Sequence, residues 1–516
     1  MNLRFVFQQL GLLLIVLSVT LVGIGLWALL PLGLGDGSRY SGATSMFVAA
    51  LVGCVSGSVL YFGAKRNGAG STFFGRREAL LLVAMSWMVG AALSALPLFF
   101  WAWEFGDDAG NTTFRSFVNC YFEAMSGLTT TGATVLTNIE NLPRSILLWR
   151  ATTHWLGGIG IVVLFVAVLP SLGVSGKKLF RVEAPGPQPE GVTPHIRDTS
   201  RILWYIYIGF TVVEVALLWA LTPMGLFDAV CHTFGTLATG GFSTRNASVG
   251  GYDSMTADLI IIVFMVLAGA NFGLYYQLFR GKFRSVWRDT ELRAYLIIIG
   301  IAAVIVSGAL WSAGVPIVTT AGTAVEPTLA ESLRYGTFTT ISIQTTTGFC
   351  TADFNVWPFI AQATIIALMF IGGCAGSTGG GIKVVRIWIV LKIFFGEIER
   401  VFRPSVVRAT RLGNTTVDDA LKLATVAYVL GIVLLFASGA VVLKMFDPGQ
   451  SFTTCATASI TTLCNVGPGL DNVGAIENYH KFSWESKLVL TLLMALGRLE
   501  VFAIIVLFSP RFWRRH

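Results

Sequence analysis

Four short runs of glycine and threonine are the residues of this chain whose types and spacing could do chemistry. They read TTTGAT at 129–134, ATGGFST at 238–244, TTTGF at 345–349 and NVGPGL at 465–470. Inside a membrane, backbone carbonyls of such loops can replace the hydration shell of a monovalent cation, as in potassium channels. Glycine reaches left-handed conformations without steric cost, so successive carbonyls can point the same way. The runs therefore predict a cation site made of main-chain oxygens.

The spacing of the runs indicates one shared site and not four separate turns. If Gly132, Gly241, Gly348 and Gly467 are equivalent, consecutive glycines lie 109, 107 and 119 residues apart. One such run is typical of an ordinary turn, whereas four at regular intervals favour internal repeats that meet at one centre. We predict that K⁺ is bound by Thr130, Thr131, Gly132, Ala133, Thr239, Gly240, Gly241, Phe242, Thr346, Thr347, Gly348, Phe349, Asn465, Val466, Gly467 and Pro468.

Each run needs an element that delivers it to membrane depth. The runs follow stretches of moderate polarity, such as 114–126 and 329–343, which are long enough for a helix through half a membrane but too short to cross it. The repeated unit is therefore a span, a re-entrant helix, a loop and a second span. Two spans per unit preserve the orientation, so we expect an all-α polytopic membrane protein. Its four repeats should lie in a pseudo-fourfold arrangement around one pore.

Composition supports the membrane assignment. The 516 residues are 54% hydrophobic and 12% charged, with a mean hydropathy of +0.71, whereas soluble domains carry about 25% charged residues. The first apolar segment is too long for the core of a signal peptide, and we expect a retained helix there. Ten segments could cross the membrane: 8–30, 43–63, 78–101, 146–170, 202–222, 257–279, 292–313, 357–394, 420–445 and 485–509.

The first two segments lie outside the repeats. We expect an N-terminal transmembrane hairpin at 1–70, repeat 1 at 71–175, repeat 2 at 195–285, repeat 3 at 286–412 and repeat 4 at 413–516.

The net charge of +8 is explained by topology. Lysine and arginine gather in short connections on one face and near both ends of the chain, so the positive-inside rule predicts cytoplasmic termini. This pattern argues against nucleic-acid binding. The seven cysteines and five histidines show no metal-ligand spacing, and no catalytic set is evident, so we do not expect an enzyme.

Two further features lie within expected spans. Six glycines interrupt the eighth segment, and helix formation is unfavourable there because each glycine costs about 1 kcal/mol relative to alanine. We expect either a structural feature, such as a simple kink or close helix packing, or a movable gate; the gate would consist of Gly372, Gly373, Gly376, Gly379, Gly380 and Gly381. Arg498 lies in the last span and should face the pore, as part of the gate, or pair with Glu500 or Glu214, because an arginine facing lipid is costly. Glu123 and Glu214 are either satisfied polar residues at helix contacts or ion ligands.

The four loops, the glycine insert and the GRLE sequence around Arg498 together resemble the Trk/Ktr/HKT superfamily of potassium transporters, and the N-terminal hairpin resembles its TrkH/TrkG-type branch. The resemblance covers essentially the whole chain. It implies potassium uptake across a bacterial inner membrane, a homodimer and a cytosolic TrkA-type nucleotide-binding regulatory subunit. It also implies an intramembrane gating loop and a pore-facing arginine. Glycine at position 132, where a serine would favour Na⁺, implies K⁺.

Two departures from potassium-channel loops lower the expected symmetry and selectivity. A single glycine is shared by all four runs, and Asn465 and Pro468 occur in the fourth alone. A K⁺/H⁺ or K⁺/Na⁺ symporter is the alternative function, although the loops hold few titratable residues.

Overall fold

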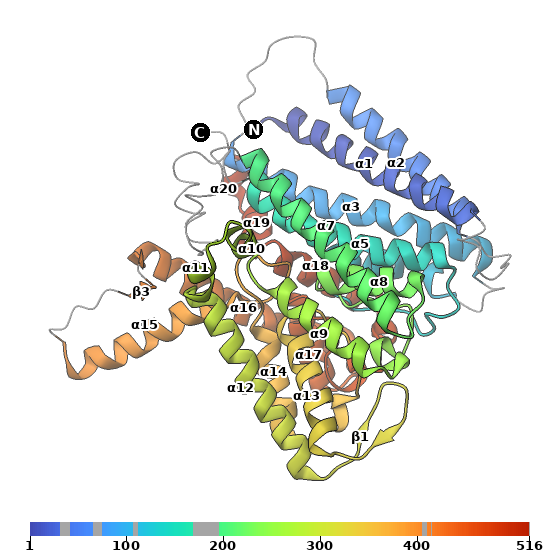
Figure 1. Ribbon diagram of the computed structural model, residues 1–516. Helices are drawn as coiled ribbons and strands as arrows, with labels where there is room; N and C mark the ends of the chain where they lie inside the picture. The colour runs from blue at the N-terminus through green and yellow to red at the C-terminus, as the bar shows by residue number, and fades with distance from the viewer. Residues whose placement is uncertain are drawn as a thin grey trace.

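The computed structural model describes residues 1–30, 42–64, 75–106, 112–168, 196–404, 410–413 and 415–514. Nearly all the regular secondary structure of the described chain is helical (Figure 1), which confirms the expected all-α class. Its strands form two small antiparallel hairpins, β1 (Ile317–Val318) with β2 (Ala324–Val325) and β3 (Arg411–Leu412) with β4 (Thr415–Thr416). The fold is therefore carried by helix packing.

Helices α1 (Leu3–Leu29) and α2 (Ala43–Ala64) form the expected N-terminal hairpin and lie along α3 (Arg76–Phe105) at the edge of the bundle (Figure 1). They approach closely because Gly11 faces Gly57, and a β-carbon at Gly57 would lie 2.8 Å from Gly11 O. Large apolar side chains on their other faces are exposed, including Val19, Leu51 and Val59. Such faces suit lipid.

Four times, a long helix is followed by a short helix and then by a third helix. The short helices α4, α8, α13 and α17 have 12, 12, 16 and 12 residues, the lengths expected of helices through half a membrane. The four sets are α3, α4 (Phe117–Leu128) and α5 (Arg144–Val168); α7 (Ile196–Leu221), α8 (Leu226–Leu237) and α9 (Met255–Gly269); α12 (Thr290–Ala313), α13 (Leu329–Gln344) and α14 (Phe359–Phe370); and α16 (Asp419–Phe446), α17 (Phe452–Leu463) and α18 (Trp484–Arg498).

Side-chain caps fix where many of these helices begin. Asp289, Asp418 and Ser451 accept hydrogen bonds from Leu292 N, Leu421 N and Thr454 N at 2.8, 2.9 and 3.0 Å. Each bond satisfies a backbone amide that has no partner within the helix.

The remaining elements of the described chain are η1 (Thr113–Arg115), η4 (Ser248–Tyr252), α10 (Phe272–Phe279), α11 (Phe283–Trp287), η5 (Phe354–Val356), α15 (Val384–Phe402), η6 (Asp471–Val473), η7 (Tyr479–Lys481), α19 (Phe502–Ile505), η8 (Val506–Phe508) and α20 (Pro510–Trp513).

The expectation of continuous spans at 257–279 and 485–509 is wrong. Helices α9 and α10 meet at 95°, and α18 bends by 111° into the segment Phe502–Phe508. Asn271 caps α10 at the first break by accepting from Gly273 N at 2.7 Å, while Glu500 and Val501 take positive φ values of 54° and 62° at the second. The eighth apolar segment is broken as expected, into α14 and α15.

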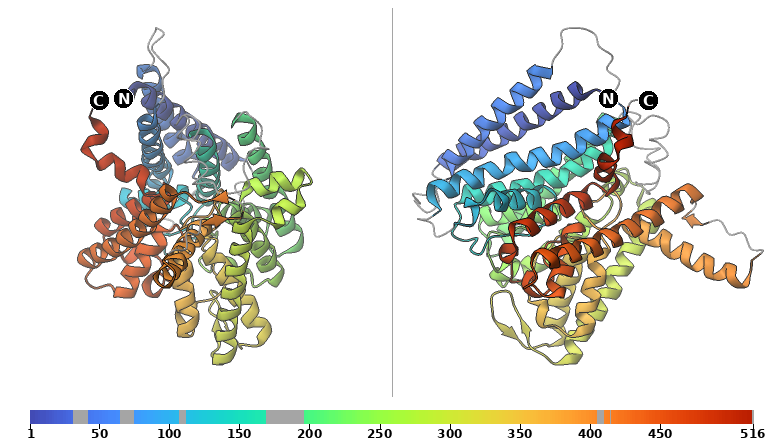
Figure 2. Two further views of the ribbon diagram at one scale, coloured as in Figure 1. Left: turned by 90° about the vertical axis from the view of Figure 1, so that its left-hand side faces the viewer. Right: turned by 180° about the vertical axis from the view of Figure 1, so that it is seen from behind.

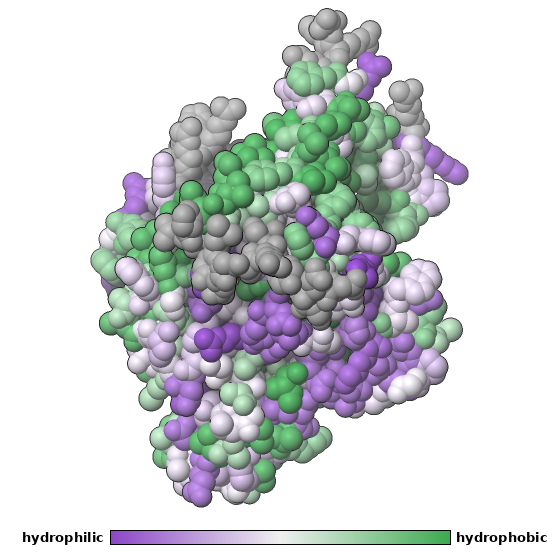
Figure 3. All heavy atoms as spheres, turned by 90° about the vertical axis from the view of Figure 1, so that its right-hand side faces the viewer, coloured by the Kyte–Doolittle hydropathy of each residue, from purple (hydrophilic) through white to green (hydrophobic). Residues whose placement is uncertain are grey.

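Among the described residues, six helices are long and apolar enough to cross a membrane, and up to eight if each bent pair counts as one span. The face in Figure 3 carries apolar surface above a wide hydrophilic area. This pattern is expected of a membrane protein with one region in contact with lipid and another in contact with water. Both chain ends lie at one end of the molecule (Figure 1), where Arg77 Nη1 donates to Arg514 O at 2.8 Å. Part of α15 extends away from the bundle (Figure 2). The basic connections expected within 65–74 and 169–195 lie outside the described residues.

Candidate functional site

The four Gly/Thr loops share one backbone conformation. Each short helix ends four residues before the repeated glycine. The glycines have φ values of 79°, 77°, 78° and 97° for Gly132, Gly241, Gly348 and Gly467. The left-handed glycine conformation expected from the sequence is therefore confirmed.

A second left-handed residue precedes each glycine by two positions. These residues are Thr130, Thr239, Thr346 and Asn465, with φ values of 53°, 53°, 61° and 55°. This conformation is uncommon for residues with a side chain. It is held by a matching backbone bond in every loop, from Thr131 N to Ser126 O, Gly240 N to Gly235 O, Thr347 N to Ser342 O and Val466 N to Thr461 O, at 2.8–2.9 Å.

The four loops contact one another in a closed ring. A β-carbon at Gly132 would overlap Gly240 O of the second loop, and one at Gly241 would overlap Thr347 O of the third. One at Gly348 would overlap Val466 O of the fourth loop, and one at Gly467 would lie 2.6 Å from Thr131 O of the first. Each glycine thus packs against the next loop, and the order of contacts returns to its start. No side chain fits at these four positions.

The sixteen residues predicted to bind the ion all lie in or beside this ring. The side chains of Thr130, Thr131, Thr239, Thr346 and Asn465 are fully buried. Asn465 Nδ2 donates to Thr131 Oγ1 at 2.9 Å and to Met494 O at 3.0 Å, so it ties the fourth loop to the first and to α18.

The aromatic residues after the second and third glycines turn away from the ring. Phe242 stacks on His154 with ring centroids 4.1 Å apart, and Phe349 lies 5.7 Å from the ring of His232. These side chains therefore support the loops from behind, and only their backbones belong to the ring.

A buried ion pair behind the first two loops was missed by sequence reasoning. Arg150 Nη2 lies 2.6 Å from Glu123 Oε1, and the guanidinium carbon sits 4.2 Å from the centroid of the Phe242 ring. Glu123 also accepts from Val135 N at 3.0 Å and from Thr134 Oγ1 at 2.9 Å. Glu123 is thus a satisfied polar residue, the first of the two alternatives. The sequence feature that could have indicated this pair is Arg150 itself, because a charged side chain within an apolar span is expected to have a buried partner.

The glycine-rich segment 372–381 packs against the inner ends of the short helices. Thr378 Oγ1 donates to Leu237 O, the last residue of α8, at 2.9 Å, and Gly380 N donates to Thr346 Oγ1 of the third loop at 2.7 Å. Cys374 N donates to Gly269 O at the end of α9 at 2.8 Å. The predicted gate residues are therefore brought directly against the predicted ion-binding residues.

Arg498 belongs to the same cluster. Its Nη1 donates to Thr378 O at 2.9 Å and its Nη2 donates to Gly157 O of α5 at 3.1 Å, and the side chain is 4% exposed. The alternative pairing with Glu500 is wrong, because Glu500 Oε2 instead accepts from Arg386 Nη2 at 2.7 Å. The positive φ at Glu500 turns the chain after Arg498 and directs the two side chains to different partners.

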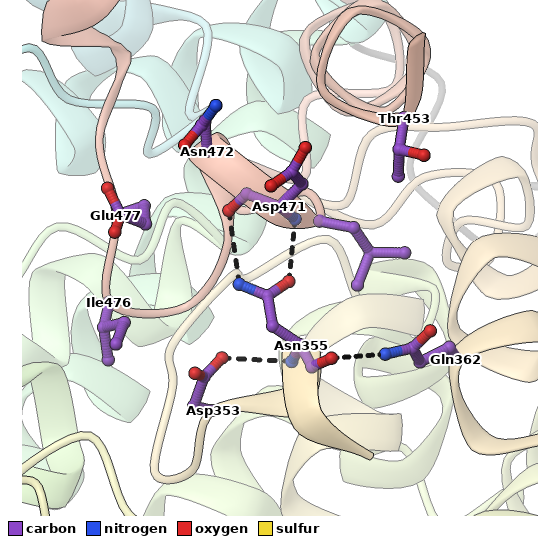
Figure 4. A pocket seen from close by; sticks show the side chains of 9 residues that line it. Asp353, Asn355, Gln362, Thr453, Asp471, Asn472, Ile476 and Glu477 are labelled. Atoms are coloured by element: carbon purple, nitrogen blue, oxygen red, sulfur yellow. Dashed lines mark hydrogen bonds between the residues drawn. The ribbon is translucent and has the colours of Figure 1, made fainter. Parts of the chain in front are cut away.

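A cavity of about 340 Å³ is lined by residues that follow the third and fourth loops, including Asp353, Asn355, Asp471 and Glu477. Figure 4 shows their side chains. Asn355 and Asp471 join the two sides of the cavity through a pair of bonds, Asn355 Nδ2 to Asp471 O at 3.2 Å and Asp471 N to Asn355 Oδ1 at 2.8 Å. Hydrogen bonds from the Ser451 and Thr454 hydroxyls lower the pKa of Asp471. Asp471 is therefore ionised at neutral pH, and it lines this hollow together with Asp353 and Glu477, whose carboxylate lies 3.0 Å from Lys481 Nζ.

Comparisons with known proteins agree with this arrangement. The sequence profile of the TrkH family, described as a cation transport protein, matches residues 46–515. The Trk system potassium uptake proteins TrkH of Salmonella typhimurium and Halomonas elongata are 36% and 37% identical, with 100% of each chain covered. The crystal structure of the potassium transporter TrkH from Vibrio parahaemolyticus matches with a TM-score of 0.83 at 32% identity, again with 100% of both chains covered.

Proposed function

This chain belongs to the TrkH family of cation transport proteins, and on that premise we propose that it takes up K⁺ across a bacterial inner membrane through a gated, channel-like pore. The observation that carries the proposal is the closed ring of four glycine loops. Non-helical backbone at membrane depth is tolerated where it lines a water-filled cavity or is buried in protein, and a ring of carbonyls suits a dehydrated monovalent cation. The relatives named as potassium uptake proteins support K⁺ as that cation.

The short helices add an electrostatic contribution. Each ends four residues before its glycine, and a helix C-terminus carries a partial negative charge of roughly half an elementary charge. Four such ends directed at one centre would stabilise a cation there. The pore would be enclosed by ten spans in pseudo-fourfold order, with the hairpin at 1–70 and repeats at 71–175, 195–285, 286–412 and 413–516. Both termini would be cytoplasmic.

The segment 372–381 and Arg498 form the proposed gate. In the arrangement described above, the segment contacts the third loop and the end of α8, and Arg498 supports it. A positive charge below the ring would oppose cations, and withdrawal of the segment would open the path. A cytosolic TrkA-type nucleotide-binding subunit would control this movement, in a homodimer of the membrane chain surrounded by lipid.

The test is uptake of ⁸⁶Rb⁺ into proteoliposomes that contain the purified chain, with K⁺, Na⁺ and Li⁺ as competitors. We expect K⁺ to suppress uptake at much lower concentrations than Na⁺ or Li⁺. Absence of uptake by the folded protein, or equal competition by the three ions, would contradict the proposal. Uptake that depends on a proton or Na⁺ gradient would indicate the symporter alternative.

A further inference from the structure

The carbonyl of each repeated glycine and the N–H of the next residue belong to one planar peptide unit, so the orientation of that unit sets the direction of the carbonyl. The described chain contains no cis peptide bond, and in a trans peptide the C=O of one residue and the N–H of the next point in opposite directions. A partner that holds the N–H from behind the loop therefore turns the carbonyl toward the ring centre. A partner that holds the carbonyl from behind does the reverse.

In the second loop the N–H is held. Phe242 N donates to His154 Nε2 at 3.1 Å, and the ring's other nitrogen, Nδ1, lies 2.7 Å from Gly127 O. Gly127 O can only accept and Phe242 N–H can only donate, so these partners require neutral His154 with its proton on Nδ1.

The histidine is firmly seated against this loop. His154 is fully buried and stacks on Phe242, and a β-carbon at Gly240 would lie 2.6 Å from the ring. The Gly241 carbonyl is consequently fixed on the side of the loop opposite to His154.

In the fourth loop the carbonyl is held instead. Pro468 has no N–H to offer, and the Tyr479 hydroxyl donates to Gly467 O at 2.8 Å. Tyr479 is 2% exposed; its ring centroid is 5.5 Å from that of Phe122 and its N–H donates to Thr134 O at 2.9 Å. The φ of Gly467 is 97°, against 77–79° for the other three glycines.

We infer that His154 and Tyr479 are specificity-determining positioning residues that act in opposite senses. His154 presents the Gly241 carbonyl to the ion, while Tyr479 withholds the Gly467 carbonyl from it. The carbonyls of the four repeated glycines would then bind a cation less strongly than four equivalent carbonyls, because the Gly467 oxygen already accepts a hydrogen bond from the Tyr479 hydroxyl. This inference rests on the proposed function, since it requires that the ring bind the transported ion.

The first arm of the test replaces His154. His154→Leu keeps an apolar side chain of similar size but removes both hydrogen bonds, whereas His154→Gln offers an oxygen to Phe242 N and an amide to Gly127 O. The readout is the ratio of the Na⁺ and K⁺ concentrations that halve ⁸⁶Rb⁺ uptake. We expect His154→Leu to lower this ratio about fivefold, the effect of losing the one bond, from Phe242 N, that orients the Gly241 carbonyl. His154→Gln should restore most of the ratio. An unchanged ratio in a folded His154→Leu variant overturns the inference.

The second arm replaces Tyr479 and remains decisive if His154→Leu does not fold. Tyr479→Phe removes one oxygen and frees the Gly467 carbonyl, so the same ratio should rise. Tyr121→Phe is the matched control, because its hydroxyl donates to Met88 O of α3 at 3.3 Å and not to a loop of the ring; it should leave the ratio unchanged. A fall in the ratio with Tyr479→Phe, or no change, overturns the inference. Failure of the unmodified protein to prefer K⁺ would instead overturn the proposed function.

Discussion

Arg498 is bonded to the glycine-rich segment itself, through Nη1 to Thr378 O at 2.9 Å. Its second bond, from Nη2 to Gly157 O at 3.1 Å, reaches α5 of the first repeat. The arginine at the end of α18 therefore joins three parts of the chain that are far apart in sequence. In the proposed gate, Arg498 and the segment 372–381 block the pore together, because the guanidinium that would repel cations also holds the segment in place.

Replacing Arg498 should separate its charge from its hydrogen bonds. Arg498→Ala loses both, and we expect faster ⁸⁶Rb⁺ uptake. Arg498→Lys keeps a positive charge but loses the planar fork that bonds two carbonyls. If the bonds to Thr378 and Gly157 hold the gate closed, the lysine variant should also be faster. Uptake as slow as that of the parent in both variants, with normal size-exclusion elution, would remove Arg498 from the gate.

Among the glycines of the segment 372–381, Gly380 makes the tightest contact with a part of the described chain outside the segment. A β-carbon there would overlap Cys464 O at the end of α17, so Gly380→Ala should push the segment away from the ring. We expect faster uptake with unaltered ion preference, because the loops themselves are unchanged. Gly396→Ala is the control, since its β-carbon would meet nothing within 4 Å. Normal uptake by Gly380→Ala would count against a closing role for this contact.

Gly132→Ser should loosen the discrimination between K⁺ and Na⁺. The side chain would overlap Gly240 O and would have to adopt a φ of 79°, a left-handed conformation that costs about 1–2 kcal/mol. The measurement is Na⁺ competition with ⁸⁶Rb⁺ uptake. Gly308→Ser, on α12 with open space around its β-carbon, should behave as the parent does. Identical competition curves for parent and Gly132→Ser would exclude this glycine from the ion site.

The buried pair of Glu123 and Arg150 should matter for stability. Removal of one partner of a buried ion pair leaves an uncompensated charge and costs about 3–5 kcal/mol, so Arg150→Met should markedly lower the thermal-unfolding midpoint of the purified protein. The control is Arg400→Met on α15, whose pair with Glu397 has a similar 2.9 Å separation but is more than half exposed; pairs of that kind are worth about 0–1 kcal/mol. Equal midpoints for the two variants would contradict the structural importance of the buried pair.

The sequence was sufficient for features that depend on local patterns. Apolar length predicted the long helices but not the two bends, at 95° and 111°, within the expected spans 257–279 and 485–509. The short polar stretches before each loop predicted short helices such as α13. The repeated glycines predicted left-handed backbone, confirmed at all four positions. Each of these features follows from the conformational preferences of a few neighbouring residues.

Features that depend on distant contacts could not be predicted in this way. The bend after α18 needs positive φ at Glu500 and Val501, two residues that rarely adopt it. The two partners of Arg498 are backbone carbonyls 120 and 341 residues away. Because every residue has a backbone carbonyl, the sequence does not indicate which ones an arginine will bind. His154 and Tyr479 contact loops of other repeats, so their roles emerged only when the repeats were assembled.

The most direct test of the central claim is the reversal potential of the purified chain in a planar bilayer with K⁺ on one side and Na⁺ on the other. A single pore formed by four carbonyl-lined loops predicts discrete current steps and a reversal potential displaced toward that of K⁺. Gly132→Ser should move this potential toward zero. Absence of current steps, or a reversal potential near zero for the unmodified protein, would contradict a K⁺-selective pore formed by these loops.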